Sequence, residues 1–172
     1  MSKFVVDVEA TGPCPGLYSM ISFGVVLLED PSQKYFSELM QPLPDSRFVE
    51  DAMRVTNTDW HDMVEFGRPI YETMADFSNW INQVNTGGRP MFFSDNNGFD
   101  WQFINYYFWY AMDHNPFGHS STNINSLYKG MKHNMHKNMK HLRKTKHTHH
   151  PVDDALGNVE ALQAMRKEGL KV

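Results

Sequence analysis

Three runs of β-branched and aromatic residues near the beginning of the chain predict three strands. The runs cover residues 3–8, 20–29 and 34–40. A cluster of glycine and proline at residues 11–16 and a Pro-Ser-Gln turn before residue 34 separate them. Because the links between the runs are short, we expect the three strands to form an antiparallel meander.

From residue 49 the spacing of apolar positions changes from a strand pattern to a helical one. Apolar residues recur every three or four positions, which predicts short helices followed by a longer helix that ends near residues 85–88. Residues 90–95 predict a buried strand, and residues 98–113 a strongly aromatic helix. Two further helices are expected over residues 123–148 and 153–168. The first of these would align an apolar stripe of Tyr128, Met131, Met135, Met139 and Leu142.

The length and composition are those of a globular chain with one domain over residues 1–172. Since 41% of the residues are hydrophobic and 13% are aromatic, global disorder is excluded. No stretch approaches the roughly 18 uninterrupted apolar residues of a spanning helix, and Asp7 and Glu9 interrupt the first apolar run before it resembles a secretory signal. Cys14 is the only cysteine, so an intrachain disulfide is excluded and a reducing, cytoplasmic location is expected.

Charge is segregated along the chain. The net charge is −4, yet residues 114–152 contain no Asp or Glu, seven of the 16 Lys and Arg, and eight of the nine His. The remaining residues carry nine basic and 20 acidic side chains, a balance of −11. Such segregation predicts a basic surface that faces a polyanion, beside an acidic body.

Two carboxylates lie in the first predicted strand. Asp7 and Glu9 are two residues apart, so their side chains leave the same face of the sheet. Carboxylates within a hydrophobic strand are unfavourable unless a cation meets them, and Mg²⁺ binds carboxylate oxygens together with substrate phosphates. The alternative is that the strand ends at Val6 and that both acids are solvated in the following loop.

Further acids are expected at two helix starts. Asp100 begins the helix after the predicted strand 90–95, and Asp154 lies in the first turn of the last helix, after Pro151. An aspartate at a helix N-terminus complements the helix dipole without further function, which is the interpretation that we favour for Asp153. For Asp154 the neighbouring histidines favour a functional role.

These acids occur in ordered motifs that resemble those of the DEDDh 3′–5′ exonuclease family. The segment Asp7-Val-Glu-Ala-Thr-Gly12 is similar to the family's Asp-x-Glu-Thr-Thr-Gly, with Ala10 in place of the first Thr. The segment Asp95-Asn-Asn-Gly-Phe-Asp100 is similar to His-Asn-x-x-Phe-Asp, with Asp95 where many members have His. The aromatic run that follows is most similar to the small single-domain exoribonuclease branch.

The third motif of the family, a histidine five residues before an aspartate, fits His149 and Asp154. The resemblance implies an RNase H-like α/β fold, with a mixed five-stranded sheet flanked by helices. It also implies metal-dependent 3′–5′ hydrolysis of nucleic acid, with RNA favoured, to nucleoside 5′-monophosphates. Asp7, Glu9, Asp100 and Asp154 would hold two divalent ions, Mg²⁺ or Mn²⁺, and His149 would be the general base.

The motifs also imply substrate contacts at Ala10, Thr11 and Asn96. Phe103, one turn beyond Asp100, is our candidate for stacking on the terminal base, an interaction of about 1–3 kcal/mol. The expected partner is single-stranded RNA or a 3′ overhang rather than a membrane. The aromatic helix 98–113 favours a homodimer.

Four alternatives stay open at the level of sequence. His150 also lies close to Asp154 and is an alternative general base. Residues 129–146, expected to be helical, form either a surface for phosphate contacts or a solvated face over the methionine stripe. Single-stranded DNA is an alternative substrate, and a non-catalytic nucleic-acid-binding module is an alternative function, although such a module has no reason to retain four repelling carboxylates.

Overall fold

The three predicted strands pair as a meander, and two later strands extend the same sheet. The computed structural model describes all residues from 1 to 172. Its strands are β1 (Lys3–Ala10), β2 (Met20–Leu27), β3 (Lys34–Ser37), β4 (Met91–Ser94) and β5 (Ser121–Asn123). The order is β3-β2-β1-β4-β5, antiparallel from β3 to β1 and parallel from β1 to β5. The expected mixed five-stranded sheet is confirmed; β5, only three residues long, was not predicted.

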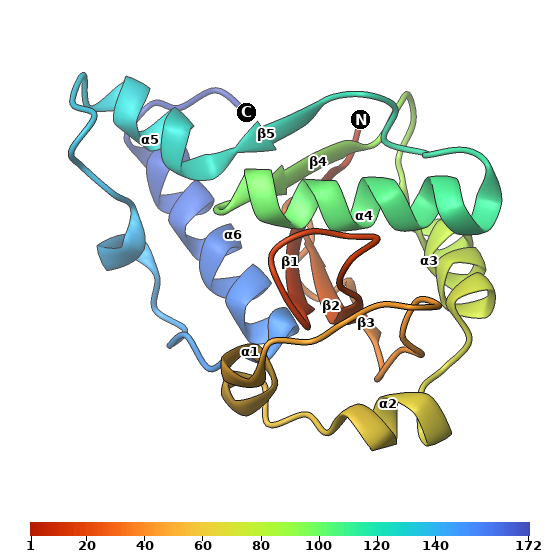
Figure 1. Cartoon of the computed structure of the whole chain (residues 1–172). Helices are drawn as coiled ribbons and strands as arrows, with labels where there is room; N and C mark the ends of the chain where they lie inside the picture. Colours follow the sequence, from red (N-terminus) through yellow and green to blue (C-terminus); the bar gives the residue numbers. More distant parts are fainter.

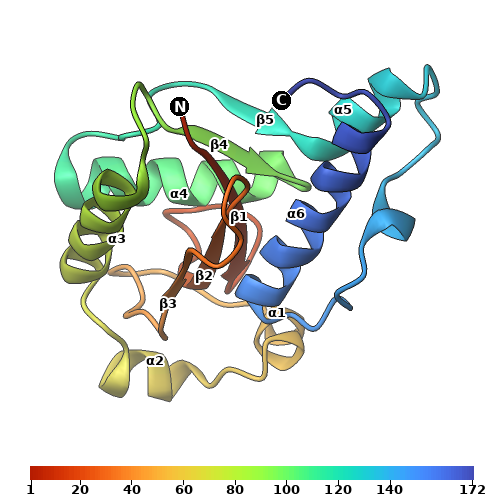
Figure 2. The ribbon, with the colours of Figure 1, turned by 180° about the vertical axis from the view of Figure 1, so that it is seen from behind.

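Helices begin where the spacing of apolar residues changes, near residue 49, as predicted. They are α1 (Glu50–Val55), α2 (Trp60–Phe66), α3 (Ile70–Val84), α4 (Asn97–Met112), α5 (Ile124–Met131) and α6 (Pro151–Lys167). None of them combines the length and the apolar character that a membrane crossing requires. The ribbon shows α3 and α4 on one side of the sheet and α6 on the other (Figure 1, and from behind in Figure 2).

Alternate side chains of β1 pack into two different hydrophobic cores, one on each side of the sheet. Phe4, Val6 and Val8 pack in the cluster that includes α3 and α4, whereas Val5 packs in the cluster that includes α5 and α6. Because side chains alternate along a strand, Asp7 and Glu9 share the face of Val5. They therefore point toward the side of the sheet that α6 covers.

A glycine in β2 lets α6 approach this face closely. Gly24 pairs with Asp7 in the antiparallel register. A β-carbon at Gly24 would lie 2.3 Å from the backbone of Pro151 and Val152, at the start of α6. The absence of a side chain therefore brings the first turn of α6, which carries Asp154, next to Asp7. The sequence signal for this close approach was a lone glycine inside a continuous apolar strand.

The helix predicted over residues 123–148 is wrong beyond α5. The chain leaves the helix after Met131, and a 3₁₀ turn over Lys140–Leu142 is the only regular element before α6. Asn134 and Asn138 accept hydrogen bonds from the backbone two residues ahead, at His136 and Lys140. Such asparagine turns compete with the helical hydrogen-bond pattern.

The methionine stripe does not exist as one face. Met139 is fully buried, whereas Met135 is 73% exposed. Tyr128 and Met139 belong to the core under α6, together with the partly buried Met131 and Leu142. We refer to residues 132–150 as the basic segment.

Candidate active site

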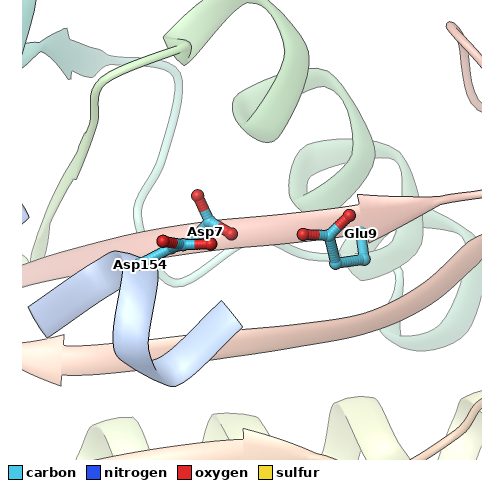
Figure 3. A group of neighbouring side chains, drawn as sticks. All are labelled: Asp7, Glu9 and Asp154. Carbon is cyan, nitrogen blue, oxygen red and sulfur yellow. The ribbon is translucent and has the colours of Figure 1, made fainter. Parts of the chain in front are cut away.

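Four carboxylates from three elements converge beside the carboxyl-terminal half of β1, the central strand of the sheet. Asp7 and Glu9 project from β1, and Asp154 approaches them from the first turn of α6 (Figure 3). One oxygen atom from each of these three side chains lies within 4.8 Å of the other two. Asp100, in the first turn of α4, accepts a hydrogen bond of 3.1 Å from the backbone N–H of Val8. The alternative, in which the strand ends at Val6 and both acids are solvated in a loop, is therefore wrong, because β1 continues to Ala10.

Burial and mutual repulsion raise the pKa values of Asp7, Glu9 and Asp100. Burial, followed by the charges of Asp100 and Glu9, raises the pKa of Asp7 well above its usual value. Burial and the charge of Asp95 do the same for Asp100. The pKa of Glu9 rises to about 7, mainly through burial and then through the charge of Asp154. Perturbed carboxylates gathered in one cavity are characteristic of a functional site.

The donor set fits a divalent cation. Oδ2 of Asp100 is buried without a hydrogen-bond partner, which leaves an acceptor that a cation would satisfy. Asp7, Glu9 and Asp100 line a cavity of about 420 Å³ that opens to solvent. Hard cations such as Mg²⁺ and Mn²⁺ bind carboxylate oxygens in such positions. A single cation near the cluster would offset the repulsion that raises the pKa values.

The structure separates the three nearby histidines. His149 lines the cavity, and its Nδ1 lies 3.9 Å from Oε1 of Glu9. His150 does not line the cavity, and its ring stacks on Phe36 with centroids 4.9 Å apart. His147 lines the cavity too, with Nδ1 2.7 Å from Oδ1 of Asp154. The geometry thus favours His149 over His150, and adds His147 as a neighbour of Asp154 that the spacing argument did not select.

The predicted substrate contacts fall into two groups. Asn96 is exposed and lines the cavity, as a substrate contact would. Ala10 is buried, and the buried hydroxyl of Thr11 donates to the backbone oxygen of Arg47. The side chains at these two positions therefore support the loop rather than face the cavity.

The stacking role expected for Phe103 is wrong. Its side chain is fully buried in the core between the sheet and α4. Phe99 lines the cavity instead, and its ring packs against Phe103 at 5.1 Å. Helical spacing placed Phe103 on the face of Asp100, but that face turns into the core after the first turn. Phe99, immediately before Asp100 in the second motif, was the available signal.

A second, basic cavity adjoins the acidic one. It measures about 290 Å³ and has no hydrophobic lining. Its lining consists of Asp95, Lys140, Arg143, Lys144, Thr145, Lys146 and His147. Asp95, Lys140 and His147 line both cavities, so the two lie side by side. The basic surface expected from the charge pattern is present, although an irregular segment carries it rather than a helix.

The comparisons with known proteins agree with this arrangement. The exonuclease family model RNase T matches residues 4–162. Over 129 residues the chain is 40% identical to the 3′–5′ DNA exonuclease Cap18 of Escherichia coli, a match that covers 74% of this chain and 68% of Cap18. The chain belongs to the RNase T exonuclease family. The predicted membership among the DEDDh exonucleases is confirmed.

Solved structures support the same fold. Cell-death related nuclease 4 (CRN-4) superposes with a TM-score of 0.78 at 16% identity, covering 98% of this chain. This chain spans 64% of the length of the CRN-4 chain. The nuclease domain of 3′hExo, a DEDDh family member bound to rAMP, gives 0.76 at 16% identity, over 98% of this chain and 92% of that chain. The E. coli ExoI–ssDNA complex superposes with a TM-score of 0.73 at 14% identity. The match covers 98% of this chain and 41% of the ExoI chain. The predicted RNase H-like fold is thereby confirmed.

Proposed function

We propose that the protein is a metal-dependent 3′–5′ exonuclease that releases nucleoside 5′-monophosphates from a single strand. The observation that carries this proposal is the convergence of Asp7, Glu9, Asp100 and Asp154 beside a cavity that adjoins a basic one. A module that only binds nucleic acid gains nothing from repelling carboxylates placed where a phosphate would lie. One domain over residues 1–172 would carry the whole site.

Each residue of the site has a distinct role in this proposal. The four carboxylates would hold two divalent ions, Mg²⁺ or Mn²⁺, whose chemistry is the stabilisation of charge on the phosphoryl oxygens during an in-line displacement. His149, at the solvent-accessible mouth of the cavity, would accept the proton of the attacking water. Asn96 and Phe99 would orient the terminal nucleotide, with the ring of Phe99 against its base.

The substrate that we propose is single-stranded DNA. The relative with 40% identity is named a DNA exonuclease, which favours the DNA alternative over the RNA preference that the motifs implied. RNA is the second candidate, because the 3′hExo domain of the same fold was solved with rAMP. The lysines of the basic cavity would contact backbone phosphates, which both nucleic acids share. The free, half-buried Cys14 needs no oxidising compartment, which supports a cytoplasmic location.

A product ladder tests the proposed activity. With Mn²⁺, 5′-labelled DNA and RNA oligomers of matched sequence should shorten stepwise from the 3′ end, DNA faster, with nucleoside 5′-monophosphates as products. Asp7→Ala should abolish the ladder without lowering the melting temperature, because it removes one of several repelling charges. Asp153→Ala is the matched control, since Asp153 lies beside Asp154 but outside the cluster. An undiminished ladder with Asp7→Ala would overturn the proposal.

A further inference from the structure

Asp154 is held by an arginine from the basic segment. Nη2 of Arg143 lies 3.0 Å from Oδ1 of Asp154 and 2.9 Å from its backbone oxygen. The side chain of Arg143 is only 9% exposed, and that of Asp154 is fully buried. Two further contacts reach the same carboxylate: Nδ1 of the exposed His147, and the backbone N–H of His149 at 3.1 Å from Oδ2.

Residues of α6 accommodate and anchor this arginine. A β-carbon at Gly157 would lie 2.5 Å from Nε of Arg143 and 2.9 Å from its Nη2, so only glycine leaves room for the guanidinium. Glu160, one turn further along α6, accepts hydrogen bonds from the backbone N–H groups of Lys144 and Thr145 at 2.7 and 2.8 Å. The backbone beside Arg143 is thus fixed to the helix that carries Asp154.

We propose that Arg143 is a positioning residue, which holds the Asp154 carboxylate in the orientation that binds metal, and that Gly157 is required for it. The inference rests on the proposed role of Asp154 as a metal ligand. A buried carboxylate beside Asp7 and Glu9 has a strong tendency to turn away from them unless a cation fixes it. The double contact of one guanidinium nitrogen, to the carbonyl and the carboxylate of the same residue, restrains Asp154 against the helix backbone.

Removal of Arg143 should change the Mn²⁺ affinity in opposite directions, depending on whether Arg143 orients Asp154 or acts only through its charge. A positive charge near a cation site weakens cation binding, so deleting a mere electrostatic neighbour would tighten the binding of Mn²⁺. Deleting a positioning residue has the opposite effect, because the ligand loses its orientation. Loss of a partner that orients a metal ligand typically weakens metal binding about 10- to 100-fold.

The experiment is titration of the full chain with Mn²⁺, followed by calorimetry or electron paramagnetic resonance. Arg143→Met and Gly157→Ala should each weaken binding about 10- to 100-fold. Gly157→Ala should lower the melting temperature less than Arg143→Met does, because alanine favours a helix and the displaced guanidinium keeps its charge in the chain. This variant decides the question if Arg143→Met fails to fold.

Two matched controls and two further variants complete the design. Arg166→Met removes an arginine of α6 that faces Glu29, and Gly130→Ala adds a β-carbon where nothing lies within 4 Å; both should bind Mn²⁺ as the wild type does. Arg143→Lys should bind Mn²⁺ as weakly as Arg143→Met does, since an ammonium group does not reproduce the planar guanidinium. Excess Mn²⁺ should restore turnover to Arg143→Met but not to Asp154→Asn.

The outcomes distinguish this inference from the proposed function. If Asp154→Asn weakens Mn²⁺ binding while Arg143→Met and Gly157→Ala bind as tightly as the wild type or more tightly, the positioning role is wrong and the metal site stands. Full affinity in Arg143→Lys would also overturn it, because the planar guanidinium would then not be needed to orient Asp154. If Asp154→Asn binds Mn²⁺ like the wild type, the metal role of Asp154 fails, and the inference fails with it.

Discussion

Backbone conformation singles out His149 among the residues of the site. It has a left-handed φ of 60° at the mouth of the acidic cavity, and its backbone N–H binds Asp154. Asparagine tolerates this conformation well, so His149→Asn removes the imidazole while retaining the backbone. We expect this variant to lower turnover about 10²- to 10⁴-fold, as for the loss of a general base. Single-turnover kinetics at saturating Mn²⁺ measures the effect.

His150→Asn is the control for this prediction. The His150 ring stacks on Phe36 outside the cavity, so its loss should change turnover little. The comparison also tests His147, which contacts Asp154 directly. A larger loss in His147→Asn or His150→Asn than in His149→Asn would show that the spacing of the third motif selected the wrong histidine.

At the scale of elements, the basic segment places exposed lysine side chains beside the carboxylate cluster. Lys140, Lys144 and Lys146 line the basic cavity, whereas Lys137 of the same segment does not. Replacing the three lining lysines with glutamine should weaken binding of a long single strand and flatten its salt dependence, by about 0.7 in the log–log slope per lost phosphate contact. Cleavage of a dinucleotide, which is too short to span both cavities, should change less.

Lys137→Gln is the matched control, because it removes a charge from the same segment without altering the cavity. Its salt slope should stay near that of the wild type. Binding titrations at several salt concentrations measure both variants with an Asp7→Ala background that prevents cleavage. An unchanged slope in the triple variant would make the basic segment a solvated face, the alternative that the sequence left open.

The sequence predicted the elements whose pattern reflects burial, and failed where side chains redirect the backbone. The strands β1 to β4 and the helices α3, α4 and α6 were each expected from the sequence, whereas β5, with only three residues, was not. Met131, Met135 and Met139 repeat every four residues as in a helix, but the side chains of Asn134 and Asn138 form turns between them. Within the site, spacing identified the four acids. Arg143 was not identified because its contact with Asp154 depends on the path of an irregular segment.

At the scale of the whole molecule, α4 and the first turn of α3 share an exposed aromatic surface, which consists of Tyr106, Trp109 and Tyr110 of α4 and Tyr71 of α3. These side chains are between 36% and 58% exposed, and the rings of Tyr106 and Tyr110 stack with centroids 6.1 Å apart. Exposed aromatic groups of this kind favour association. We expect a homodimer through this surface, measured by sedimentation over a range of concentrations.

Replacement of both Trp109 and Tyr110 with lysine should shift the homodimer to monomer. Phe66→Lys, on α2, is the control for the loss of an exposed aromatic group elsewhere, and should leave the mass unchanged. A wild-type protein that sediments as a monomer at all concentrations would contradict the dimer.

The acid cluster also determines how the stability of the whole chain depends on pH. Burial and then Asp154 raise the pKa of Glu9 from 4.5 to about 7, so the folded chain holds a proton there that the unfolded chain has lost. Stability without metal should therefore fall as pH rises from 4.5 through about 7, and the raised pKa values of Asp7 and Asp100 act in the same direction. Thermal melts in a chelator measure this decline, which Glu9→Gln should make shallower because glutamine does not titrate.

Added Mn²⁺ should raise the melting temperature most at high pH, where the carboxylates are free to bind it. An identical decline in Glu9→Gln and the wild type would show that the cluster does not set the pH dependence.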